Sequence, residues 1–152
     1  MFSLRLGDDF DALVEHQETL LAYEASRALA SEWVRFADSM STPLRTLLEK
    51  GRNISLEGYQ QARQATEKAQ RRIAWYFQND IDAILAPSAP AAAPEGITST
   101  GDPLYSRAWT LLGGPCLSLP IYKVNGLPIG VQLIGNRYAD AKLFAIARNV
   151  IE

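Results

Sequence analysis

The chain has 152 residues and a net charge of −2 at pH 7, and its 15 basic residues are scattered, with Arg71-Arg72 as the only adjacent basic pair. This distribution argues against nucleic acid and against an anionic membrane surface as partners. Hydrophobic residues make up 47% of the sequence, which is enough to bury a core in one domain of this length and gives no sign of disorder.

A single cysteine, Cys116, excludes an internal disulfide and is ordinary for a reducing cytosol, so we expect a cytoplasmic protein. The sequence also has a single histidine, His16. A zinc site is therefore not expected, and no cofactor is predicted. We interpret Cys116 as a small buried apolar residue and His16 as solvated. No apolar run reaches the ~20 residues needed to span a bilayer, and the first residues lack a signal-peptide pattern.

The first forty residues are predicted to form a short strand and a long helix. Residues 2–6 alternate apolar and polar side chains, which is the pattern of an edge strand. Gly7 breaks this pattern, and Asp8 or Asp9 is expected to cap a helix. Apolar residues at helical spacing then predict one amphipathic helix from residue 10 to about residue 40.

Two further helices are predicted before the middle of the chain. Thr42-Pro43 indicates the start of a short helix, because a capping hydroxyl precedes a proline at the first helical position. Gly51 is expected to end that helix. Ser55 is expected to cap a third helix over roughly residues 56–79, whose apolar residues form one seam.

A short apolar strand and a long loop are predicted next. Residues 82–86 are apolar without alternation, which favours a strand that is buried on both faces. The 17 residues 87–103 exceed the ~12–15 residues of an ordinary connection. Prolines restrict this segment, so we interpret it as an ordered wall of a functional site.

The remaining elements are predicted to be two strands and a helix. The strands are expected over residues 116–120 and 129–135. Asn125-Gly126, which lies between them, is a strong signal for a hairpin turn. Asp140 is expected to cap a final amphipathic helix.

This order of elements predicts an α/β fold with a mixed sheet flanked by helices. We expect a single domain over residues 1–152, in which residues 1–80 supply a strand and cover helices. Residues 81–152 then supply the other strands, the pocket loop and the final helix. Four strands leave two open apolar edges, so the sheet is expected to be incomplete alone.

Four segments of the second half follow one another at characteristic spacings: DAILAPSAP (82–90), STGDP (99–103), WTLLGGPCLSLP (109–120) and GLPIGVQLIG (126–135). Together they resemble the C-terminal part of the amidase signature family, whose members hydrolyse amide C–N bonds. The last segment is the most specific. The resemblance covers essentially the whole chain, but only about the last third of a full-length family member.

The resemblance implies that this chain lacks the catalytic set. Family members use a serine nucleophile, a second serine beside a cis peptide bond, and a lysine base. The chain has no Ser-Ser pair and no Gly-Gly-Ser stretch. None of its lysines matches the family's base, so no catalytic residue is predicted.

The resemblance also implies that this part of the fold forms one side of a substrate pocket. Six residues are therefore candidates for binding substrate, because they offer hydroxyls, a carboxylate, close backbone approach and a flat apolar face. Trp109 also fits plain core packing. The candidates are Ser99, Thr100, Gly101, Asp102, Trp109 and Thr110.

Three functions remain open. In the first, the chain is the C-terminal portion of an amidase-signature hydrolase, inactive alone, with an amidase N-terminal half as partner and a small amide as the substrate of the complete enzyme. In the second, it is a non-catalytic binding or assembly module that associates, with itself or others, through open sheet edges. In the third, it is an independent serine hydrolase that uses Ser88 or Ser118.

Overall fold

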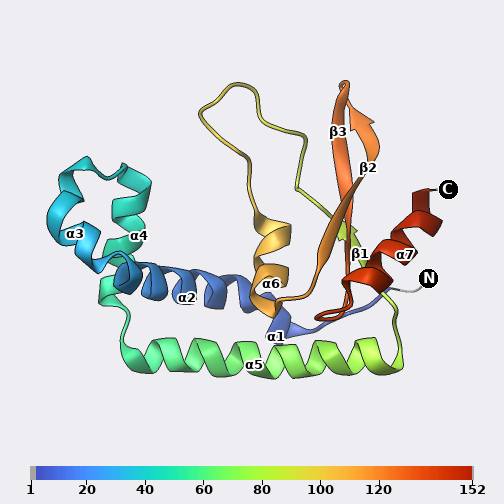
Figure 1. Cartoon of the computed structure of the whole chain (residues 1–152), viewed down its shortest axis with the longest axis horizontal. Helices are drawn as coiled ribbons and strands as arrows, with labels where there is room; N and C mark the ends of the chain where they lie inside the picture. Colours follow the sequence, from blue (N-terminus) through green and yellow to red (C-terminus); the bar gives the residue numbers. More distant parts are fainter. Residues whose placement is uncertain (1–2, 152) are drawn as a thin grey trace. The chain divides into compact units, whose positions relative to one another are not determined.

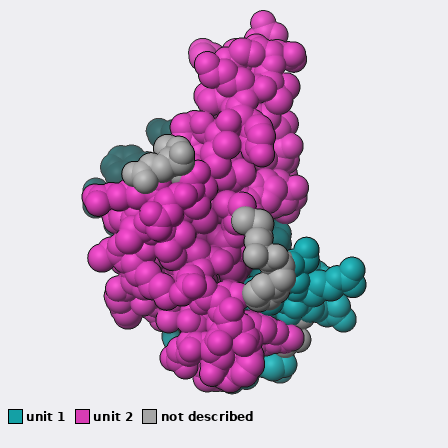
Figure 2. Space-filling model, turned by 90° about the vertical axis from the view of Figure 1, so that its right-hand side faces the viewer, with its two compact units in different colours: residues 1–68 teal, residues 69–152 magenta. Residues whose placement is uncertain are grey.

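The computed structural model describes residues 3–151 of the chain. The chain forms two compact units, residues 1–68 and 69–152, which Figure 2 colours separately. Their boundary lies within helix α5 (Leu56–Asn79). The single-domain prediction stays a prediction.

The first unit is helical. Its elements are α1 (Asp8–Asp11), α2 (Leu13–Ala28), α3 (Ala30–Phe36), the 3₁₀ turn η1 (Ala37–Ser39), α4 (Thr42–Asn53) and the first half of α5. The helix predicted from residue 10 to residue 40 is present, but it is interrupted. Leu29, between α2 and α3, has φ −102° and ψ 23°, which departs from helical geometry.

The strand predicted over residues 2–6 is wrong for residues 3–6, which are irregular, and Phe2 lies outside the described residues. An alternating pattern forms a strand only where a partner strand satisfies its backbone groups, and none does so here among residues 3–151. Asp8 is the first residue of α1 and not its cap, a position that Gly7 occupies. The side chain of Asp9 is outside the described part of the chain.

Helix α4 runs past Gly51 to Asn53, so the prediction that Gly51 ends the helix is wrong. Gly51 is buried where α4 meets α2, and a Cβ atom there would collide with the backbone of Ala22 and lie 2.8 Å from the Cβ of Ser26. The Arg27 guanidinium donates a hydrogen bond to the Gly51 carbonyl at 3.1 Å. Glycine is therefore required for close helix packing, not for termination.

We expect Gly51→Ala to lower the free energy of unfolding by about 1–3 kcal/mol, because overpacking between the two helices outweighs the gain in helix propensity. Urea unfolding followed by circular dichroism measures this change. Gly58→Ala is the matched control, since the nearest atom to its added Cβ is the Ser55 hydroxyl at 3.4 Å. Equal or greater stability of Gly51→Ala would contradict the close-packing account.

The predicted start of α5 is confirmed. The Gly58 amide donates to the Ser55 hydroxyl at 3.1 Å, as expected of a helix cap. The Tyr23 and Tyr59 rings stack with centroids 4.1 Å apart, and this contact holds the start of α5 against α2.

The second unit contains a three-stranded sheet and three helical segments (Figure 1). Its elements after α5 are β1 (Ile84–Pro87), α6 (Leu104–Leu112), β2 (Cys116–Val124), β3 (Leu127–Ile134) and α7 (Asp140–Ile151). The strand order is β1-β3-β2, and both pairs are antiparallel. The predicted α/β class is confirmed. A mixed sheet also has parallel pairs, and the described strands form only antiparallel ones.

The hairpin predicted at Asn125-Gly126 is confirmed, since these residues have φ values of 52° and 82° and join β2 to β3. The register of β2 shifts between Leu119 and Tyr122. Pro120 lies inside this irregularity, where a residue without an N–H group is tolerated in a strand. Helix α7 begins at Asp140 itself, which therefore lies in the first turn and is not the cap.

The sheet separates two packing layers of the second unit. On one face, Leu119 and Leu133 form a core with Leu143 and Ala147 of α7. The opposite face carries the alternate residues of each strand, and there Gln132 contacts α6. β3 is the middle strand, and it is buried most deeply at its C-terminal end, over Gln132, Leu133 and Ile134.

Two burial predictions are wrong. β1 is not buried on both faces, because Leu85 is 44% exposed. Cys116, expected to be a buried apolar residue, is exposed at the start of edge strand β2. Both residues lie on outer strands that pair on one side only within residues 3–151. The desolvation that remains at Cys116 raises the pKa of its thiol.

Candidate functional site

The pocket loop, residues 88–103, connects the end of β1 to the start of α6 (Figure 1). It surrounds an open hollow of about 550 Å³. Prolines and alanines form one part of the wall, while polar residues near α6 form the other. The lining residues are Ala89, Pro90, Ala91, Ala92, Pro94, Ser99, Thr100, Gly101, Asp102, Pro103 and Arg107.

Four of the predicted substrate-binding residues meet in this hollow, namely Ser99, Thr100, Gly101 and Asp102. Local hydrogen bonds fix them: the Ser99 hydroxyl accepts from the Gly101 amide at 3.1 Å, and Asp102 Oδ1 accepts from the first amide of α6 at 2.9 Å. Arg107 Nη2 lies 4.0 Å from the Asp102 carboxylate. The hollow thus presents hydroxyl groups and one ion pair beside an apolar wall.

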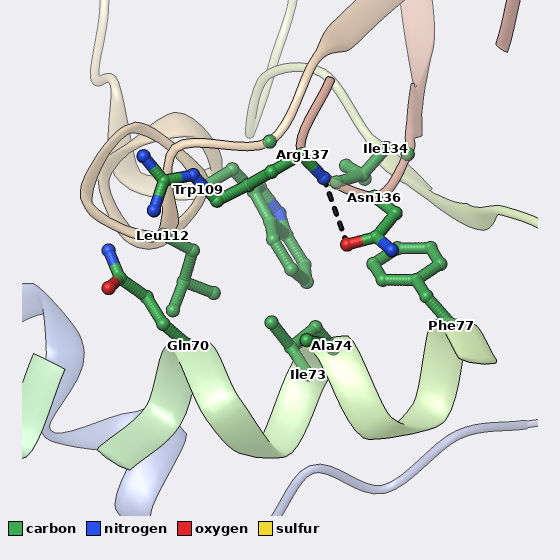
Figure 3. A pocket seen from close by; sticks show the side chains of 11 residues that line it. Gln70, Ile73, Ala74, Phe77, Trp109, Leu112, Ile134, Asn136 and Arg137 are labelled. Atoms are coloured by element: carbon green, nitrogen blue, oxygen red, sulfur yellow. Dashed lines mark hydrogen bonds between the residues drawn. The ribbon is translucent and has the colours of Figure 1, made fainter. Parts of the chain in front are cut away.

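The structure does not bring the other two candidates to this hollow. Trp109 lines a separate small cavity of about 30 Å³, where its indole lies above Ile73 and Ala74 of α5 (Figure 3). Thr110 is exposed on α6, and its hydroxyl donates to the Ser106 carbonyl at 2.9 Å. Neither side chain lines the hollow beside the pocket loop.

Two serines that the sequence offered as candidate nucleophiles, Ser88 and Ser118, instead hold the first end of the pocket loop together with Gly130. The Ser88 amide donates to the carbonyl of Gly130, a residue to which the sequence assigned no role, at 3.0 Å. The Ser88 and Ser118 hydroxyls are 2.9 Å apart, so each is the other's hydrogen-bond partner. A Cβ atom on Gly130 would lie 2.7 Å from the Ser118 hydroxyl and 2.8 Å from that of Ser88.

Gln132 is the other residue that was missed. Its side chain is buried, with 4% of the residue exposed. Its Nε2 donates to the Pro87 carbonyl and to the Tyr105 carbonyl, each at 2.9 Å. The spacing Gly-x-Gln was visible in GLPIGVQLIG, and period-two alternation places Gly130 and Gln132 on one face of the strand. The carbonyl partners, however, lie far away in sequence.

We expect Gly130→Ala to destabilise the chain by about 1–3 kcal/mol, because the added methyl group would force the two serine hydroxyls apart. Ser118→Ala alone removes an exposed hydrogen bond and should cost about 1 kcal/mol or less. In the double variant the methyl group gains the space that the Ser118 hydroxyl leaves. Chemical unfolding should therefore show it to be more stable than Gly130→Ala alone, whereas simple addition of the two losses would contradict this contact.

The described part of the chain contains no group of three or more His, Cys, Asp or Glu side chains that could hold a metal ion. No helix within residues 3–151 combines the length and the apolar character needed to cross a membrane. The Ser88–Ser118 contact pairs two hydroxyls with each other, and this contact does not supply either serine with a base.

Comparison with models of protein families shows to which family the chain belongs. A family model described as Amidase matches residues 10–144. The chain belongs to the amidase family. Curated relatives of this amidase-family chain include the A subunit of glutamyl-tRNA(Gln) amidotransferase from Neisseria gonorrhoeae (strain NCCP11945), 39% identical over 94 residues, covering 55% of this chain and 20% of the relative. The corresponding protein from Thermotoga maritima is 42% identical over 79 residues, covering 47% and 16%.

Solved structures support the same fold. A crystal structure of an amidase matches with a TM-score of 0.81 and 26% identity, covering 90% of this chain and 34% of that one. A bacterial aryl acylamidase of the amidase signature enzymes matches with a TM-score of 0.69 and 19% identity, covering 93% and 34%. The amidase-family chain therefore spans about a third of these structures and about a fifth or less of the curated relatives.

Proposed function

We propose that the chain is the C-terminal portion of an amidase-signature C–N hydrolase and supplies sheet strands and one wall of the substrate pocket. The observation that carries this proposal is a three-stranded sheet with two edges that pair with no further strand within residues 3–151, in a family whose matched members are several times longer. The hollow beside the pocket loop is the part of the substrate site that this chain would contribute.

Exposed apolar side chains on the strands support an incomplete sheet. Leu85 of β1 and the outer half of the β2–β3 hairpin carry large hydrophobic residues that no described element covers, and Tyr122 is 62% exposed. Unpaired strand edges with such side chains favour pairing with further strands. The hairpin residues concerned are Ile121, Tyr122, Val124 and Leu127.

The chemistry of amide hydrolysis supports inactivity of the chain alone. A serine nucleophile needs a base to accept its proton and donors to stabilise the oxyanion. No residue of the chain matches the serines and the lysine that the resemblance implies for the family. We place the complete enzyme in the cytoplasm, with a small amide substrate and with an amidase N-terminal half as the partner that carries these groups.

A second candidate function rests on the same open edges. A non-catalytic assembly module would use β1 and β2 to bind a second copy of the chain or another protein by strand addition. Sedimentation distinguishes the two candidates. Self-association without affinity for an amidase N-terminal half favours the module, whereas a heterodimer with that half favours the hydrolase.

We expect the purified chain to release no more p-nitroaniline from a p-nitroanilide than buffer does, because no residue of the chain is predicted to act as the nucleophile or as its base. Adding a polypeptide that carries the family's serines and lysine should bring activity above that of the polypeptide alone. The Ser88→Ala/Ser118→Ala variant is the control for intrinsic hydrolysis. Hydrolysis by the chain alone that this variant abolishes would contradict the proposal.

A further inference from the structure

One side chain holds both ends of the pocket loop. Pro87 immediately precedes the loop and Tyr105 follows it, 18 residues later in the sequence. The carbonyl groups of both residues accept hydrogen bonds from Gln132 Nε2, at 2.9 Å each. Gln132 thus joins the end of β1 to the first turn of α6 and closes the segment between them.

The chemistry of this contact requires a side chain with two hydrogen-bond donors, which the Gln132 amide supplies. Both neighbours are carbonyl oxygens, so the group that faces them must donate two hydrogen bonds and accept none. A carboxylate would offer only acceptors, and an aliphatic or thioether side chain would offer no donor. Gln132 is buried and both hydrogen bonds are partly buried, although Pro87 and Tyr105 are exposed as residues. Without the two donors, the carbonyl groups would have only water on their open side as a partner, and this loss costs free energy.

A second contact holds the first residue of the loop from the same face of β3. Ser88 bonds to the Gly130 carbonyl through its amide and to the Ser118 hydroxyl through its own hydroxyl. Gly130 leaves the space in which the two hydroxyls meet. Gly130 and Gln132 are two residues apart on one strand, so their positions share a face and act on the same loop.

We infer that Gln132 is a positioning residue for the pocket loop and that Gly130 and Ser118 assist it at Ser88, so that strand β3 sets the shape of the hollow. We call the contacts of Gln132, Gly130 and Ser118 with the loop ends the loop clamp. The role of the loop clamp toward an amide substrate rests on the proposed function, but the contacts themselves do not. In a complete enzyme, these residues would act through the loop on the substrate-facing groups and would not touch the reacting atoms.

Gln70 provides a matched control within the same unit. Its Nε2 donates to the Leu111 carbonyl at 3.1 Å, so it too is a side-chain amide bonded to the backbone of α6. Leu111 lies near the other end of that helix, away from the pocket loop. Gln70→Met and Gln132→Met therefore remove the same chemical group and differ in whether the loop ends lose a donor.

Amide hydrogen exchange of the chain, read by mass spectrometry, tests the inference. In Gln132→Met, exchange of the hydrogen-bonded amides of residues 88–103, those of Ser88 and Gly101, should rise about tenfold or more over the unmodified chain, which corresponds to a loss of roughly 1.4 kcal/mol in local opening free energy. Exchange in the β2–β3 hairpin should change much less. Gln70→Met should leave residues 88–103 unchanged.

Gln132→Glu adds a chemical rescue. A protonated carboxyl group can donate one hydrogen bond to a loop end, while the carboxylate can donate none. Loop protection, corrected for the intrinsic exchange rate at each pH, should therefore recover in part when Gln132→Glu is acidified. Gln132→Met should show no such recovery.

Three results would overturn the inference: no rise in loop exchange in Gln132→Met, an equal rise across the hairpin and the loop, or an equal loop effect in Gln70→Met.

If Gln132→Met does not fold, the Ser118→Ala variant provides the test. It changes only the partner of Ser88, and it should raise exchange at the start of the loop by a few fold. An unchanged loop in Ser118→Ala would then count against the loop clamp. None of these readouts depends on hydrolysis, so failure of the proposed function would be seen separately.

Discussion

The two hydrogen bonds from the buried Gln132 amide are the constraint on which the position of the pocket loop depends. They connect the middle strand of the sheet to the strand before the pocket loop and to the helix after it. A loop of this length would otherwise have considerable freedom, because closing a long segment costs conformational entropy. Fixing both ends through one side chain confines that freedom to the middle of the loop, where the hollow lies.

The same sheet is buried along part of its middle strand and exposed on its outer strands. Around Gln132 and Ile134 the middle strand is buried between α7 and α6, whereas Leu85 and the outer part of the hairpin are exposed. Exposed hydrophobic side chains that gather on one surface are typical of interaction sites. Membership of the amidase family, together with the short span of the matched relatives that the chain covers, makes the missing part of a hydrolase the natural candidate in our proposal.

Local signals in the sequence predicted local structure well. Asn125-Gly126 predicted the hairpin, and Ser55 predicted the start of α5, because each depends on backbone geometry within a few residues. Gly51 was misinterpreted because its role depends on a second helix. The burial predicted for residues 82–86 and for Cys116 presumed covering strands that the described chain does not contain. Gln132 could not be assigned from sequence, since its two partners are backbone carbonyls in distant segments.

Nuclear magnetic resonance of the Gln132 side-chain amide tests the central claim most directly. If both N–H groups are bonded to Pro87 and Tyr105, their protons should exchange with water at least about tenfold more slowly than those of an exposed glutamine. Gln60, exposed on α5, is the internal reference. Exchange of the Gln132 amide protons as fast as those of Gln60 would contradict the account.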